Sequence, residues 1–222
     1  MTNQPPAVTR PARLPLTVEA VFPVVAQQAY VWAAPYPRDR WMDLTFGVLA
    51  GLIVVIYTVQ RRNLLTRRTF GLASWIDHWR AAGPVLAFTA GAVVALLIGG
   101  HLTSGAPHGG LRWDSDIVGA LLGYPLWGLV QQALVFGVAF PRLRLAYGGP
   151  AAIVASALLF GAAHAPNPLL MFGGAIMVLA YGLVWQRWPA LIVVALSHGI
   201  IGAVCDKALH VSMRVGAPYF MS

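Results

Sequence analysis

The stretch GLVQQALVFGVAFPRLR, residues Gly128–Arg144, has the character of a membrane span that contains two adjacent glutamines. Apart from Gln131 and Gln132, the run up to Phe140 consists of apolar residues and glycine, and it ends in Pro141 and two arginines. A polar side chain in the hydrocarbon of a bilayer is costly and marks a functional position by default. The stretch therefore predicts a membrane-embedded helix that carries part of a polar site.

The composition of the whole chain also indicates a membrane protein. Of its 222 residues, 58% are hydrophobic and only 10% are charged, and the mean hydropathy is +0.68. Soluble domains carry about 25% charged residues, so we expect a polytopic integral protein, located in a bacterial inner membrane. The net charge of +8 is assigned to arginines that flank spans. Nucleic-acid binding is not expected, since no basic run is interleaved with aromatic stacking residues in a soluble domain.

Apolar runs separated by proline and glycine predict an all-α fold, a polytopic transmembrane helical bundle of about six spans. The expected spans cover residues 41–60, 82–101, 117–140, 149–163, 168–185 and 188–205. Together they form one transmembrane domain, 41–205. A proline-rich segment, 1–40, precedes this domain, and a polar C-terminal tail, 206–222, follows it.

Two further segments suit the membrane surface. Residues 61–80 interleave arginines with tryptophans and leucines, which fits an amphipathic interfacial helix and, equally well, a basic loop. Residues 18–34 are apolar enough for a second interfacial helix or, as an alternative, a seventh span. Most arginines next to spans, including Arg142 and Arg144, fall on one side. This side is predicted to be cytoplasmic, which leaves both termini outside.

Four polar side chains remain at membrane depth in this topology. Gln131 and Gln132 lie in the middle of the third span, His198 lies in the middle of the sixth, and His164 follows the short fourth span. Each of them alone fits a structural hydrogen bond between helices, worth about 1 kcal/mol or less. Their compatible depths predict instead that all four converge on one cavity in the outer half of the bilayer.

The order of these residues resembles that of the CAAX-protease and bacteriocin-processing family, known as CPBP or Abi. Phe160-Gly-Ala-Ala-His164, within LLFGAAHAPNP, is similar to the family's Phe-x-x-x-His motif, and His198 begins a stretch similar to its His-x-x-x-Asn motif. Gln131 and Gln132 stand where the family has the paired glutamates of Glu-Glu-x-x-x-Arg. The resemblance covers residues 117–205, and it implies a helical membrane endopeptidase in which a glutamate activates water for attack on a peptide bond.

The chain departs from the family at three motif positions. The paired glutamates are glutamines, the arginine position is Phe136, and the asparagine position four residues after His198 is Gly202. A carboxylate can be tuned to accept a proton as a general base, whereas a primary amide only donates and accepts hydrogen bonds. The single glutamate of the chain, Glu19, lies far upstream. We therefore expect a divergent member that is not a working glutamate-type protease.

Three functions remain compatible with the sequence. The preferred one is a non-proteolytic binding protein or accessory subunit of a membrane complex, in contact with the lipid bilayer, with an isoprenoid or pigment, and with other membrane subunits. His164 and His198 would then suit the metal of a tetrapyrrole, whereas a zinc site is not expected because a third ligand is lacking nearby. The alternatives are a membrane enzyme in which these histidines act on a lipid or isoprenoid, and a CAAX-type endopeptidase in an inactive Glu-to-Gln form.

Overall fold

The computed structural model of this chain describes residues 13–33, 42, 45–49, 52, 67, 70–72, 74–104, 117–209 and 213–221. Within these residues the chain is predominantly helical, and they contain no strand. The elements are α1 (Arg13–Ala33), α3 (Trp75–Ser104), α4 (Ile117–Gln132), the π-helix η1 (Ala133–Ala139), α5 (Phe140–Tyr147), α6 (Gly149–Ala162), α7 (Pro168–Trp185), α8 (Leu191–Leu209) and the 3-10 helix η2 (Ala217–Met221). The predicted all-α class is confirmed for this part of the chain.

Four helical rods in the described residues are long and apolar enough to cross a membrane: Trp75–Thr103, Leu122–Tyr147, Pro168–Trp185 and Leu191–Leu209. The helix α6 is also apolar, but it has only 14 residues. Of the six predicted spans, 168–185 coincides with α7, and 41–60 lies largely outside the described residues. The number of six spans accordingly stays a prediction.

Two helices run further than the sequence predicts. α3 begins at Trp75 and not at Ala82, so the last residues of the segment 61–80 belong to this span, and the rest of that segment lies largely outside the described residues. α8 ends at Leu209 and therefore includes Asp206, which the sequence assigns to the polar tail.

The third predicted span continues past Pro141 instead of ending at Phe140. α4, η1 and α5 form one rod, in which the amide of Phe140 bonds the carbonyl of Val135, five residues back. In a regular α-helix a proline clashes with the carbonyl four residues before it. The wider π-helical turn that ends next to Pro141 lets the rod continue to Tyr147. The predicted end of this span was therefore wrong.

Arg142 lies inside the bundle and not in a cytoplasmic loop, which corrects its use as a marker of orientation. Its side chain has no exposed area; Nε donates to Oε2 of Glu19 at 2.8 Å, and Nη1 donates to the carbonyl of Val138 at 3.0 Å. The helix α1 thus brings the single glutamate of the chain against α5, where its charge compensates the buried guanidinium. The orientation of the termini stays a prediction that rests on the other arginines.

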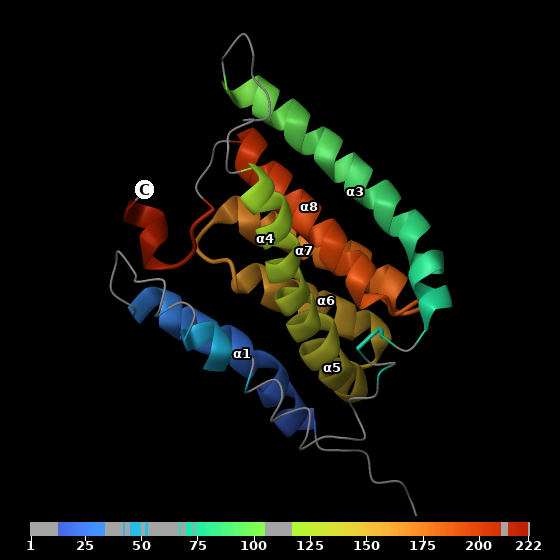
Figure 1. Cartoon of the computed structure of the whole chain (residues 1–222). Helices are drawn as coiled ribbons and strands as arrows, with labels where there is room; N and C mark the ends of the chain where they lie inside the picture. The colour runs from blue at the N-terminus through green and yellow to red at the C-terminus, as the bar shows by residue number, and fades with distance from the viewer. Residues whose placement is uncertain are drawn as a thin grey trace, which may run out of the picture.

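The helix α1 packs along one side of the bundle, where it contacts α5, α6, η1 and η2 (Figure 1). Leu16, Ala20 and Val31 are buried, whereas Leu14 and Val18 are exposed. Although α1 has 21 residues, it is not among the helices that are apolar enough to cross a membrane. Most of the segment 18–34 is thus helical as part of α1, and its placement at the membrane surface stays a prediction.

We predict that Glu19→Gln lowers the free energy of unfolding by about 3 kcal/mol, because it leaves the buried guanidinium of Arg142 without its counter-charge. Denaturation of the detergent-solubilised protein, followed by circular dichroism, measures this change. The double variant Glu19→Gln/Arg142→Met should recover part of the loss, since it removes the uncompensated charge. A single variant as stable as the natural protein would show that the ion pair does not hold α1 in place.

Candidate functional site

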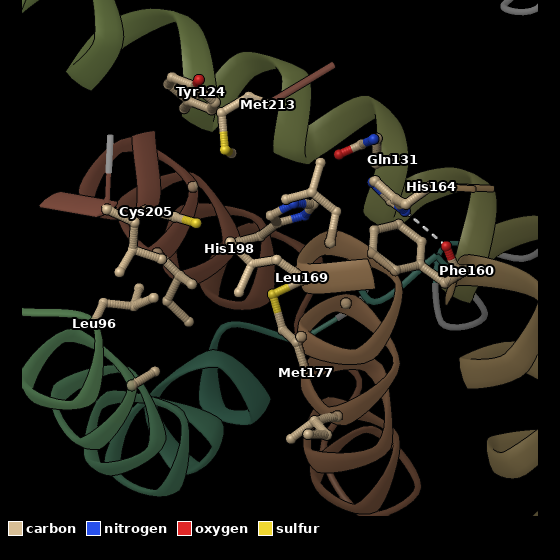
Figure 2. A pocket seen from close by; sticks show the side chains of 18 of the residues that line it. Leu96, Tyr124, Gln131, Phe160, His164, Leu169, Met177, His198, Cys205 and Met213 are labelled. Carbon is tan, nitrogen blue, oxygen red and sulfur yellow. Dashed lines mark hydrogen bonds between the residues drawn. The ribbon is translucent and has the colours of Figure 1, made fainter. Parts of the chain in front are cut away.

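A cavity of about 790 Å³ lies between α3, α4, α7 and α8, next to the end of α6 (Figure 2). This volume falls in the usual range for ligand sites, about 300–1,000 Å³. Most of the wall is apolar, and it includes Leu96, Trp127, Leu169, Met177, Ile201 and Leu209. The cavity therefore suits an apolar molecule, and its few polar groups determine which polar head group such a molecule can carry.

Three of the four predicted site residues line one end of this cavity. Gln131 comes from α4, His164 from the turn after α6, and His198 from α8 (Figure 2). The ring of Phe160 lies against both imidazoles, with its centroid 4.6 Å from that of His164 and 5.6 Å from that of His198. The fourth residue, Gln132, is not among the lining residues, so the two glutamines have different roles.

Gln132 is fully buried and holds the imidazole of His198 in position. The amide Nε2 of Gln132 donates to Nδ1 of His198 across 2.8 Å. Because Nδ1 accepts this bond, the neutral ring carries its proton on Nε2. The other amide atom of Gln132, Oε1, has no hydrogen-bond partner among the described residues. Gln132 is thus a positioning residue that fixes both the direction and the tautomer of His198.

His164 is held in the opposite tautomer by its own helix. Its Nδ1 lies 2.7 Å from the carbonyl oxygen of Phe160, which precedes it by one helical turn. A carbonyl oxygen can only accept a hydrogen bond, so Nδ1 of His164 carries the proton and Nε2 keeps a lone pair. Both imidazoles therefore leave Nε2 for a further partner, as a hydrogen-bond acceptor in His164 and as a donor in His198.

A chain of buried hydroxyl groups fixes α8 next to His198. Oη of Tyr181 lies 2.5 Å from Oγ of Ser197, and Oγ of Ser197 lies 2.5 Å from Oγ1 of Thr89. Thr89 donates in turn to the carbonyl of Val85 at 2.7 Å. These hydroxyls tie α7, α8 and α3 together, and every member of the chain has a partner, as a polar group in a core requires.

The cavity also contains a polar residue that the sequence analysis missed, Gln27 of α1. The amides of Gln27 and Gln28 both donate to the carbonyl of Ala163, at 3.0 and 2.7 Å, directly before His164. Gln27 and Gln131 also line a second cavity of about 60 Å³ on the α1 side. The available signal was a second pair of adjacent glutamines in an apolar segment, which α1 brings to the site.

At two of the positions where the chain departs from the family motifs, the side chains nearby are aromatic rings. Phe136 has no exposed area, and its ring stacks on that of Trp185 with centroids 4.7 Å apart and an angle of 19°. At Gly202, an added Cβ would lie 2.9 Å from Cδ1 of Tyr124. The position of the motif arginine is thus filled by a ring of the core, and at the position of the motif asparagine the ring of Tyr124, which lines the cavity, lies close to the backbone.

The described residues that line the cavity include no aspartate, glutamate, lysine or arginine. Glu19 is bonded to Arg142 and is not one of them. No group of three histidine, cysteine, aspartate or glutamate side chains in the described part of the chain could hold a metal ion. The described wall of the cavity consequently provides neutral hydrogen-bonding groups.

The approach of α4 to α8 depends on glycine. An added Cβ at Gly199 would overlap the backbone of Pro125, and one at Gly128 would lie 2.9 Å from the carbonyl oxygen of Ala195. Small residues at such crossings let two helix backbones come close. This close approach brings the side chain of Gln132 within bonding distance of His198.

Comparison with known proteins supports the resemblance predicted from the motifs. Residues 112–204 match the family model described as type II CAAX prenyl endopeptidase, Rce1-like. The matched segment contains Gln131, Gln132, His164 and His198. No curated protein and no solved structure matches the chain. Together with the four apolar helices, the family match identifies an integral membrane protein in contact with the lipid bilayer.

We predict that Gly199→Ala destabilises the protein by about 1–3 kcal/mol, the usual cost of overpacking a close contact, because its methyl group meets the backbone of Pro125. Gly123→Ala is the matched control, since it lies on α4 and an added Cβ there meets nothing within 4 Å. Thermal denaturation in detergent compares the two variants. Equal midpoints would contradict the close packing of α4 on α8.

Proposed function

We propose that this membrane protein, whose residues 112–204 are Rce1-like, binds the apolar chain of a lipid or isoprenoid and does not cleave peptides. The observation that carries the proposal is a cavity of about 790 Å³ with apolar walls and a neutral polar end. Burial of an apolar chain in such a space contributes about 25 cal/mol for each Å² removed from water. The residues of the site therefore support the binding of an apolar chain better than they support peptide cleavage.

The chemistry of the site argues against peptide hydrolysis. A glutamate-type protease needs a carboxylate that takes a proton from water, and the amides of Gln131 and Gln132 cannot do so near neutral pH. Glu-to-Gln changes alone would leave the arginine and asparagine of the motifs in place, whereas this chain has Phe136 and Gly202 there. An endopeptidase in a merely inactivated form is therefore the less favoured alternative.

A membrane enzyme is the second candidate, and one observation favours it. The imidazoles of His164 and His198 lie at the same end of the cavity in opposite tautomers, so one is set to accept a proton and the other to donate one. Incubation of the protein with membrane lipid extracts distinguishes catalysis from binding. A product that is lost in both His164→Asn and His198→Asn would replace the binding function by an enzymatic one.

A tetrapyrrole is an alternative occupant. His164 donates Nδ1–H to a carbonyl and keeps the lone pair of Nε2, which is the arrangement typical of a metal-ligating histidine. His198, with its proton on Nε2, would have to change tautomer to act as a second ligand. An absorption spectrum of the purified protein tests this occupant directly. Proteins that co-purify with the chain test the role of accessory subunit in the same preparation.

We predict that mass spectrometry of the gently extracted protein finds a retained lipid or isoprenoid, and that Gly173→Leu lowers its amount about tenfold, because a side chain there enters the cavity. Gly173 lines the cavity, and an added Cβ meets nothing within 4 Å. Gly123→Leu is the matched control, because Gly123 is equally open but does not line the cavity. Equal retention by both variants would show that the apolar chain is bound elsewhere.

We further predict that Gln131→Glu/Gln132→Glu does not cleave a farnesylated peptide. The restored carboxylates would still lack the motif arginine, because Phe136 is packed on Trp185, and they would lack the asparagine at Gly202. A fluorogenic prenylated peptide measures cleavage, with an active CAAX endopeptidase as the positive control. Cleavage by the natural chain would overturn the proposed function, and cleavage by the double variant alone would identify an inactivated protease.

A further inference from the structure

We propose that the polar end of the cavity binds the neutral hydroxyl head of a long-chain alcohol, whose chain occupies the apolar part. This inference rests on the proposed function and names the class of ligand. It follows from the hydrogen-bonding character of His164 and His198, which line the same end of the cavity beside Phe160 (Figure 2).

His164 requires a hydrogen-bond donor on the ligand. Its Nδ1–H is engaged by the carbonyl of Phe160 at 2.7 Å, so only the lone pair of Nε2 is left for a partner in the cavity. A ligand head that only accepts hydrogen bonds, such as an ether, an ester or a quinone carbonyl, leaves this nitrogen without a partner. A buried polar atom without a partner costs binding free energy.

His198 requires the opposite, a hydrogen-bond acceptor. Its Nδ1 accepts from the amide of Gln132 at 2.8 Å, and the proton of the neutral ring is on Nε2. A hydroxyl group is the smallest head that is donor and acceptor at once. It can donate to Nε2 of His164 and accept from Nε2–H of His198, and the neighbouring amide of Gln131 accepts or donates as needed.

Charge excludes the common anionic heads. The described residues that line the cavity contain no lysine or arginine, and the ring of His198 is neutral because its Nδ1 accepts the bond from Gln132. A diphosphate or carboxylate placed there would lose its water without gaining a counter-charge, which is strongly unfavourable. The same chain with a hydroxyl head loses little hydration and keeps two hydrogen bonds.

A series of head groups on one chain tests this assignment in the natural protein. The probes are farnesol, farnesyl methyl ether and farnesyl diphosphate, titrated calorimetrically into the full chain in detergent. We expect farnesol to bind about tenfold more tightly than the ether, the effect of one lost hydrogen bond, and the diphosphate to bind most weakly. Hexadecanol carries the same head group on a straight chain, so it separates a preference for isoprenoids from a preference for any long-chain alcohol. Binding of either alcohol in preference to the ether supports the proposal.

Two substitutions at His164 provide a matched pair. His164→Asn keeps a donor near the position of Nδ1, for the carbonyl of Phe160, but has no distal nitrogen. His164→Gln keeps a polar atom at the distal position. We expect the preference for farnesol over the ether to disappear in the asparagine variant and to persist in the glutamine variant. His101→Gln, outside the cavity, should bind like the natural chain.

The outcomes separate this inference from the function on which it rests. If the three farnesyl probes bind equally, or the ether or the diphosphate binds best, the hydroxyl assignment is wrong and the binding of apolar chains stands. If none of the probes binds and no lipid is retained on extraction, both are wrong. The head-group series needs only the natural chain, so it decides the question even if a histidine variant fails to fold.

Discussion

The hydrogen bond between the amide of Gln132 and the imidazole of His198 is the interaction on which the site depends. It crosses from α4 to α8 and joins the fully buried Gln132 to a histidine that lines the cavity. It exists because glycines at 128 and 199 let the two helices approach closely. It also sets which nitrogen of His198 bears the proton, and therefore which hydrogen bond the cavity offers to a ligand.

The helix α1 supplies polar partners that the membrane-spanning helices lack. Glu19 compensates Arg142 on α5, and two turns further along the same helix Gln27 and Gln28 bond the carbonyl of Ala163. This carbonyl belongs to the end of α6, where backbone acceptors have no partner within the helix. α1 thereby fixes the turn that carries His164, so the N-terminal segment takes part in building the site.

The sequence predicted those features that depend on local pattern. The apolar runs predicted the helices, and motif order predicted that Gln131, His164 and His198 belong together. It did not predict the continuation of a helix through Pro141, because a π-helical turn has no clear signature in composition. It also misplaced Glu19 and Arg142, since an ion pair between residues so far apart in the chain follows only from tertiary packing. The role of Gln27 was missed for the same reason.

Electrostatics links two of the departures from the family motifs, the glutamines at 131 and 132 and the phenylalanine at 136. With amides at Gln131 and Gln132, an arginine at the position of Phe136 would find no carboxylate at these two positions, and the described residues that line the cavity include no aspartate or glutamate. An uncompensated guanidinium inside a membrane bundle is costly, whereas a phenyl ring at that position stacks on Trp185 and extends the core. Gly202 in turn admits the ring of Tyr124 where a polar side chain would have faced the cavity. Amides at Gln131 and Gln132 are therefore compatible with an apolar residue at position 136, and the described wall of the cavity that results is neutral.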